Sequence, residues 1–383
     1  MRSTVRSAEG AGMMVEVDQD MQESVLLREI IRDKIQREGP LTFRDFMEMA
    51  LYHPDLGYYT ASRPRLGESG DFYTSAYLTC LFGELLARQL EEMWQVLGRG
   101  SFTVVEYGAG SGLLCRDILS RLRENGALYE KLNYFIIEKS GAMRERERLM
   151  LPEKVEWRES IGEIGEVTGC IFSNELVDNF AVHRVFMADE LKEVYVGFER
   201  DFVEELRPAP EMLKGYLAGL GVRLPAGYQA EINLEATRWI QEVGEALERG
   251  WVMTIDYGYP AAVLYSKRSG TLACYHRHRV HYSPYEFIGE QDITSHVNFS
   301  ALDQWGRHKG LEVGGFTNQT RFLQGLGLAS RLRNEEENGL AEVDEQRIRT
   351  FLMDMGQKFK VLIQRKGIGK VFLSGLAFSD LLG

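Results

Sequence analysis

EYGAGSG, residues Glu106 to Gly112, is the stretch of the sequence that says most about its architecture. It follows an apolar run at 102–105, which predicts a buried strand, and it precedes a helix-like segment at 113–123. A strand, a glycine-rich turn and a helix in this order predict the first βα unit of a nucleotide-binding type of α/β fold. A dinucleotide fingerprint requires glycine or alanine at its sixth position, where this sequence has Leu113, so an NAD-binding loop is disfavoured.

The third glycine of the stretch comes early, which gives a GxGxG pattern at Gly108, Gly110 and Gly112. Together with Glu106, two positions before the first glycine, it resembles the S-adenosylmethionine loop of class I methyltransferases. Glycine permits the close backbone approach that such a ligand needs, and this ligand has no pyrophosphate that a helix N-terminus would have to face. We expect the Glu106 carboxylate near the cationic amino-acid end of the ligand. A glycine-rich turn also arises for packing reasons alone, so the pattern needs support from elsewhere.

The next predicted strand supplies that support. The apolar segment at 133–137 ends in Glu138, at the position where an acidic residue closing the second strand binds ribose hydroxyls. We therefore expect Glu138 to contact the ribose of the cofactor.

Composition sets limits on the function. The chain has 383 residues, of which 44% are hydrophobic and 27% charged, and its net charge is −12. An acidic chain argues against nonspecific nucleic-acid binding, which needs clustered cations. The four cysteines form no CxxC pair, which favours a reduced, intracellular protein. No apolar run reaches the roughly 20 residues that a membrane span needs, so we expect none.

Predicted strands and helices alternate along most of the chain. Strands are expected at about 102–107, 133–138, 154–157, 169–173, 251–257, 311–317 and 359–364, and helices at about 25–36, 43–51, 77–97 and 234–249. Such alternation predicts a mostly parallel, doubly wound α/β sheet. Alternating apolar and polar residues at 191–206 predict a β-hairpin. We expect a disordered N-terminus over residues 1–20, a helical N-terminal extension with a lid loop over 21–98, and a Rossmann-like domain over 99–383 whose second lobe is inserted at about 190–235 and 260–300.

Several motifs together carry a resemblance to a known family. They are GDFYTS at 70–75, EYGAGSG at 106–112, SNELVDNFAVHR at 173–184, IDYGY at 255–259 and EQDITSHVNFSAL at 290–302. In this order they resemble the MidA family of S-adenosylmethionine-dependent methyltransferases, from about residue 25 to the C-terminus. The resemblance implies a class I methyltransferase fold. Mitochondrial members of the family assist assembly of respiratory complex I and methylate arginine in one of its core subunits.

The segment after the fourth predicted strand carries the candidate catalytic residues. Glu175 and Asp178 lie at the carboxyl edge of the predicted sheet, where open α/β sheets bind their ligands. Two carboxylates there suit a guanidinium, because they hold two of its nitrogens and orient the third. His183 is a candidate acceptor for the released proton. The family usually has two aromatic residues and then Asp-Ala-Leu-Pro after Asn-Glu, whereas this chain has LVDNFA at 176–181, which leaves the identity of the acceptor open.

Further residues are expected around the cofactor. Asn174 directly precedes Glu175, and the resemblance places the loop with Asp71 and Thr74 as a lid over the cofactor, with Asp71 near its polar end. We expect no metal. Cys274, His276, His278 and His281 have zinc-ligating side chains, but the spacing C-x-H-x-H-x-x-H is not that of a zinc finger, and a polar hairpin is favoured. Asp292 and His296 are second-tier candidates for the active site.

The acceptor remains open between two classes, and a third reading makes the chain an assembly chaperone with a cofactor-binding site. A protein substrate with arginine as the acceptor is favoured over a small molecule. An open acidic groove favours a protein, and a closed apolar pocket favours a metabolite. The expected location is the cytoplasm for a bacterial protein and the mitochondrial matrix for a eukaryotic one, and a homodimer is compatible with the sequence.

Overall fold

The structure is a computed structural model that describes residues 9–61, 80–152, 154–337, 356–380 and 382. Its main sheet has the strand order β15-β16-β10-β5-β2-β3-β4, and the short β14 pairs with the end of β10. The strands are β2 (Phe102–Tyr107), β3 (Leu132–Ile137), β4 (Val155–Arg158), β5 (Val167–Asn174), β10 (Leu247–Tyr259), β14 (Val297–Asn298), β15 (Glu312–Asn318) and β16 (Phe359–Lys366). β16 runs antiparallel to both neighbours, and β10, β5, β2, β3 and β4 are parallel. The predicted mostly parallel α/β sheet is confirmed.

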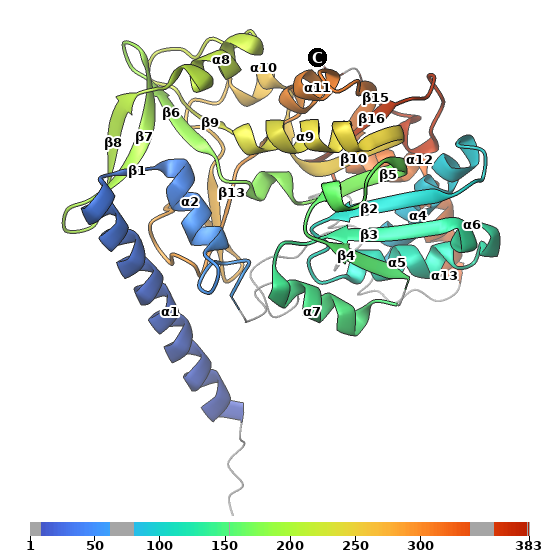
Figure 1. The fold of residues 1–383 in the computed structure, drawn as a ribbon, viewed down its shortest axis with the longest axis horizontal. Helices are drawn as coiled ribbons and strands as arrows, with labels where there is room; N and C mark the ends of the chain where they lie inside the picture. Colours follow the sequence, from blue (N-terminus) through green and yellow to red (C-terminus); the bar gives the residue numbers. More distant parts are fainter. Residues whose placement is uncertain (1–8, 62–79, 153, 338–355, 381, 383) are drawn as a thin grey trace, which may run out of the picture.

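Helices cover both faces of this sheet because its central strands are apolar on both sides. Val104 and Phe172 pack on one face with α4 (Cys80–Val96) and α5 (Leu113–Leu122). Val105 and Ile171, each one residue away, pack on the opposite face with α9 (Leu234–Ala246) and α11 (Phe299–Arg307). Figure 1 shows the sheet lying between helices that come from distant parts of the chain. The remaining helices of this part are α6 (Gly126–Lys131), α7 (Gly141–Met150), α12 (Gln319–Gly325) and α13 (Leu328–Glu337), with 3₁₀ turns at η1 (Ile161–Glu163), η2 (Val177–Asn179) and η4 (Ser374–Leu376).

A second lobe is built from two smaller antiparallel sheets. The larger sheet has the order β1-β7-β6-β9, with β8 paired to β7, and the smaller one has the order β12-β11-β13. The strands are β1 (Leu41–Thr42), β6 (His183–Met187), β7 (Leu191–Phe198), β8 (Phe202–Pro208), β9 (Gln229–Ile232), β11 (Ala273–His276), β12 (Arg279–His281) and β13 (Asp292–Thr294), and the helices are α8 (Glu211–Gly219) and α10 (Ala261–Leu264). The predicted hairpin at 191–206 is the β7–β8 pair.

The N-terminal segment belongs to this second lobe. Leu27 of α1 (Glu9–Glu38) and Phe46 of α2 (Phe43–Tyr52) share an apolar core with Val194 and Ile293. α2 begins as predicted, since the Asp45 amide donates to Thr42 Oγ1 at 3.1 Å. α4, which the sequence grouped with the extension at 21–98, instead packs on α5 in the main domain.

Residues 9–20, expected to be disordered, are helical. α1 begins at Glu9, and its N-terminal part projects away from the body of the molecule (Figure 1). No proline or glycine occurs between residues 13 and 38, so nothing in the sequence stops the helix from extending toward the N-terminus. Within the described ranges, no helix combines the length and the apolar character that crossing a membrane would require.

Candidate functional site

The glycine loop after β2 adopts a conformation that only glycine takes without strain. Gly108, Gly110 and Gly112 all have positive φ, at 65°, 59° and 78°. A Cβ atom added to Gly108 would lie 2.8 Å from Leu176 Cδ1. The loop therefore brings bare backbone close to the turn that follows β5.

A cavity of about 950 Å³ opens at the carboxyl ends of β2, β3 and β5, where the glycine loop lies. Its described lining includes Glu106, the first two loop glycines, Glu138, Asn174, Glu175 and Asp178 among the predicted site residues. This is the position at which open α/β sheets bind ligands. The structure thus brings most of the predicted donor and acceptor residues to a single cavity.

Glu106 is more deeply buried than the sequence suggested. Its side chain is 2% exposed, and the Tyr134 hydroxyl donates to Glu106 Oε2 at 2.6 Å. Burial raises the pKa of this carboxyl to about 7, against the opposing effect of the Tyr134 hydrogen bond. Its proposed contact with the cationic end of the cofactor therefore requires a carboxylate that is only partly ionised at neutral pH in the free protein.

Glu138 lies where the sequence placed it, directly after β3. Its Oε1 accepts a hydrogen bond from the Ser140 amide at 2.7 Å, and burial raises its pKa. This bond fixes the carboxylate at the start of α7, beside the glycine loop in the cavity lining.

The turn after β5 is held in an unusual conformation. Glu175 has a positive φ of 53°, which is uncommon for a residue with a side chain and often marks a functional position. Its amide donates to Ile255 O at 3.0 Å, and Asn174 Nδ2 donates to its Oε1 at 3.2 Å. Asp256 Oδ2 accepts from the amide of Val177 at 2.9 Å, with longer contacts to the two amides beside it. Asp256, at the end of β10, therefore positions the turn.

Four carboxyl groups meet at this turn, and we call Glu175, Asp178, Asp256 and Asp292 the acidic cluster. Asp178 and Asp292 are 3% and 4% exposed, and Tyr59 donates to Asp292 Oδ1 at 2.8 Å. Burial, and then repulsion from the other three members, holds the pKa of Asp178 well above its ordinary value. Burial raises the pKa of Asp256 to about 7. A cation bound beside these groups would relieve their repulsion.

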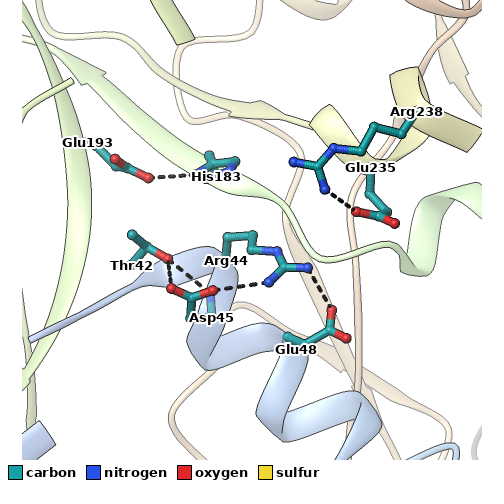
Figure 2. A network of polar contacts seen from close by, with 8 residues as sticks. All are labelled: Thr42, Arg44, Asp45, Glu48, His183, Glu193, Glu235 and Arg238. Atoms are coloured by element: carbon teal, nitrogen blue, oxygen red, sulfur yellow. Dashed lines mark hydrogen bonds and ion pairs between the residues drawn. The ribbon is translucent and has the colours of Figure 1, made fainter. Parts of the chain in front are cut away.

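The charges around the cavity are predominantly negative. The acidic residues of the described lining are Glu48, Asp55, Glu106, Glu138, Glu159, Glu175, Asp178, Glu235, Glu242 and Asp292, and the basic ones are Arg44 and Lys139. Figure 2 shows Arg44 on α2 contacting both Asp45 and Glu48, with nitrogen–oxygen distances of 3.1 and 3.3 Å. In the same view Glu235 of α9 is paired with Arg238. The cavity therefore suits cationic ligands.

His183 does not join the site. It begins β6, and its Nδ1 lies 2.6 Å from Glu193 Oε1 on the neighbouring strand β7 (Figure 2). The chain turns into the second lobe after Ala181, so His183 is not among the described residues of the cavity lining. His183 pairs with Glu193 across two strands of the second lobe, so another group must accept the proton released in the reaction.

The remaining predictions fall elsewhere. Asp71 and Thr74 lie outside the described residues. The segment from Cys274 to His281 forms the predicted hairpin, with Cys274 fully buried and the His276 ring stacked on Phe287 at 4.0 Å between centroids. The described part of the chain holds no group of three or more potential ligand side chains placed to bind a metal ion.

Sequence reasoning missed three residues that shape the site: Tyr52 and Tyr59, which line the cavity, and Asp256, which holds the turn after β5. Asp256 lies in the motif IDYGY at 255–259, but it was given no role in the sequence-based prediction. An acidic residue near the end of a buried strand could have indicated a site residue. Tyr52 and Tyr59 line the cavity, but they precede the glycine loop by about 50 residues and nothing in their local pattern points to it. Asp292, a second-tier candidate, lies in the acidic cluster, whereas the His296 ring packs at a tilt against Tyr259, with centroids 5.4 Å apart, and is not part of the described lining.

The residues present fit S-adenosylmethionine. The glycine loop presents backbone that a Cβ would cover, Glu138 is fixed at the end of β3, and Asn174 Oδ1 is buried without a hydrogen-bond partner in the described structure. The acidic lining matches the cationic sulfonium and ammonium groups of that cofactor.

Comparisons with known proteins agree with this geometry. The profile of a family described as "Putative S-adenosyl-L-methionine-dependent methyltransferase" matches residues 85–317. The crystal structure of a methyltransferase-like protein from Burkholderia thailandensis bound to S-adenosyl-homocysteine superposes with a TM-score of 0.86 at 29% identity and covers 99% of both chains.

Curated relatives include the mitochondrial protein arginine methyltransferase NDUFAF7 of Bos taurus, 27% identical over 80% of this chain and 74% of that protein. The human protein of the same name is 26% identical over 88% of this chain and 80% of its own length. Because the profile spans more than half of the chain, the protein belongs to this family of S-adenosyl-L-methionine-dependent methyltransferases.

Proposed function

We propose that this methyltransferase modifies an arginine side chain of a protein substrate. The observation that carries the proposal is the acidic cluster, because three of its members, Glu175, Asp178 and Asp292, line the same cavity as the glycine loop. The curated relatives, named protein arginine methyltransferases, support the same acceptor. A subunit of a respiratory complex is the substrate that the family resemblance favours, in the mitochondrial matrix or in the bacterial cytoplasm.

The acidic cluster would overcome the main difficulty of an arginine acceptor. The guanidinium group has a pKa above about 12 and delocalised lone pairs, so it is a poor nucleophile unless it is oriented. Carboxylates of Glu175 and Asp178 would hold two of its nitrogens and turn the third toward the cofactor. When bound, S-adenosylmethionine supplies an electrophilic methyl group. Holding donor and acceptor in line provides most of the rate gain in such a displacement.

Transfer of the methyl group to a guanidinium nitrogen releases one N–H proton, so that the methylated product carries a single positive charge and not two. Asp178 Oδ1 is buried and has no hydrogen-bond partner in the described structure. The bound guanidinium would hold Asp178 as a carboxylate. Burial and the neighbouring carboxyls raise the pKa of Asp178, so this carboxylate would then take up the released proton. We assign Asp178 the role that the sequence had given to His183. Glu106, Gly108, Gly110, Gly112, Glu138 and Asn174 form the proposed cofactor side of the site.

Labelling with tritiated S-adenosylmethionine tests the proposal. A cell lysate is incubated with the wild-type protein, with Glu175→Gln and with the surface control Glu130→Gln, and labelled residues are mapped by mass spectrometry. We expect label on arginine, a loss of about 100-fold or more in Glu175→Gln because the acceptor is misplaced, and full labelling by the control. Cofactor affinity in Glu175→Gln should stay within a few-fold.

The location of the label decides between the acceptors. Label confined to small molecules, or to residues other than arginine, would refute the arginine proposal. Wild-type turnover by Glu175→Gln would remove Glu175 from the acceptor site.

A further inference from the structure

The segment after α2 folds back on the end of that helix. The amides of Tyr58 and Tyr59 donate to Ala50 O at 3.1 Å and to Leu51 O at 3.0 Å. Gly57 makes this return possible, because a Cβ atom there would lie 2.5 Å from the His53 nitrogen. The fold-back places Tyr59 directly against Tyr52, the last residue of the helix.

The rings of Tyr52 and Tyr59 are stacked on each other. Their centroids are 5.6 Å apart with an interplanar angle of 21°, and Tyr58 meets Tyr59 edge-on at 5.0 Å. The Tyr52 hydroxyl donates to Asn179 O at 3.2 Å, and the Tyr59 hydroxyl donates to Asp292 Oδ1 at 2.8 Å. Both rings line the cavity and are only partly buried, so aromatic surface is presented there with its polar ends already bonded.

The hydroxyls of Tyr52 and Tyr59 are hydrogen-bonded to the acidic cluster or to the turn that carries it. Tyr59 holds Asp292, and Tyr52 bonds the backbone of the turn that carries Asp178. The Ser295 amide donates to Asp178 O at 2.9 Å, which ties the segment after β13 to the same turn. Asp178 Oδ1, in a side chain 3% exposed, is a buried acceptor without a hydrogen-bond partner among the described residues. Such an atom is costly unless a ligand satisfies it.

We propose that Tyr52, Tyr59 and Asp292 form the subsite that selects a guanidinium group, a proposal that rests on the proposed function. A ring of the tyrosine pair receives the face of the guanidinium, and Asp292 with Asp178 accepts hydrogen bonds along its edge. The Tyr59 hydroxyl acts as a positioning group for Asp292.

The chemistry of the subsite distinguishes arginine from lysine. A guanidinium is planar, stacks on aromatic rings and presents a fork of donors to carboxylates, whereas an ammonium is a compact and strongly hydrated point charge. A flat aromatic wall beside buried carboxylates therefore favours the planar cation. The three residues come from the N-terminal segment and from β13, so acceptor selection resides in the second lobe and cofactor binding in the main sheet.

Two probes test the subsite without knowledge of the protein substrate. Both are analogues of S-adenosylhomocysteine in which nitrogen replaces sulfur, one carrying a tethered alkylguanidinium and the other an alkylammonium of equal length. Calorimetry gives their dissociation constants, with S-adenosylhomocysteine as the reference ligand. We expect the wild type to bind the guanidinium probe about 10-fold more tightly than the ammonium probe.

Variants then locate the source of that preference. Tyr59→Leu and Asp292→Asn should each lose most of it while binding S-adenosylhomocysteine within about 2-fold of the wild type, which excludes unfolding as the cause. Tyr59→Phe keeps the ring and should retain more of the preference than Tyr59→Leu. Tyr129→Leu, a matched change on α6 outside the cavity lining, should retain all of it.

The outcomes separate the two proposals. A wild type that does not prefer the guanidinium probe refutes the arginine acceptor itself. A wild-type preference that survives in both Tyr59→Leu and Asp292→Asn refutes only the subsite. Should Tyr59→Leu also lose S-adenosylhomocysteine, Tyr52→Leu and Asp292→Asn decide by the same criterion.

Discussion

Glu106 is buried, which favours its neutral form, although a cationic ligand beside it would need the charged form. Its carboxyl is buried against Tyr134, which stabilises the end of β2, yet the same residue borders the cavity where a cationic ligand is expected. Burial raises its pKa from 4.5 to about 7, so the folded protein holds a proton there that the unfolded chain has already released.

The consequence is a stability that falls as the pH rises. Below about pH 4.5 the Glu106 carboxyl is protonated in both states and adds nothing. Between about pH 4.5 and 7 only the unfolded chain releases the proton, so the free energy of unfolding decreases, by up to about 3 kcal/mol above pH 7. Glu106→Gln, which cannot ionise, should remove this part of the pH dependence.

Thermal unfolding between pH 4.5 and 8 measures the effect. The melting temperature of the wild type relative to Glu106→Gln should decline through this window. Comparing the two proteins cancels contributions of the same sign from Asp178 and Asp256, whose pKa values are also raised. Parallel curves for the two proteins would show that Glu106 ionises as readily in the folded state as in the unfolded chain.

At the scale of elements, the glycine loop after β2 tolerates substitution least, because its backbone conformation requires glycine. Gly108→Ala places a side chain at a φ of 65° and 2.8 Å from Leu176 Cδ1, so the loop must move away from its position. The strain costs about 1–2 kcal/mol, and the displaced backbone should weaken S-adenosylhomocysteine binding by about 10-fold or more in calorimetry. Gly126→Ala is the matched control, because a Cβ there meets nothing within 4 Å. Equal affinities in the two variants would contradict the role of the loop.

The elements themselves were largely predictable, because each central strand is a short apolar run bounded by turn residues. The runs at 102–107 and 169–173 became β2 and β5, and the glycine and acidic residues after them marked the carboxyl edge of the sheet. Glu175, Asp178 and Glu138 could be found for the same reason. A strand end is a local signal, and parallel strands bring such ends together.

Residues placed by tertiary folding gave no such signal. Tyr59 reaches the cavity through a return over Gly57 and a bond to Asp292, which is 233 positions later in the chain. His183 was misjudged for the opposite reason. It follows the acidic turn closely in sequence, but β6 carries it into a strand pair with Glu193. Proximity in sequence is a poor guide once a chain leaves one lobe for another.

At the scale of the whole molecule, the cavity lies between two separately packed lobes and is lined by residues of both. The main sheet contributes the glycine loop, Glu138 and the turn after β5, and the second lobe contributes α2, the fold-back at 57–61 and β13. Each lobe has apolar cores of its own, so a ligand that touches both would couple them. The main sheet would then bind the cofactor, and the acceptor would contact both lobes, through the turn after β5 and through the subsite of Tyr52, Tyr59 and Asp292.

Hydrogen exchange of backbone amides can show which lobe contacts the cofactor and which contacts the acceptor group. Amides bordering a bound ligand open less often, and their exchange slows. S-adenosylhomocysteine should protect residues 108–112, 138–142 and 174–179, which belong to the main sheet. The guanidinium probe should add protection at 52–61 and 292–295, since it extends to the tyrosine pair and Asp292. The ammonium probe, of equal length, separates recognition of the guanidinium from mere occupancy of the cavity. Added protection that is confined to the main sheet would contradict the subsite of Tyr52, Tyr59 and Asp292 and leave the second lobe without a part in substrate selection.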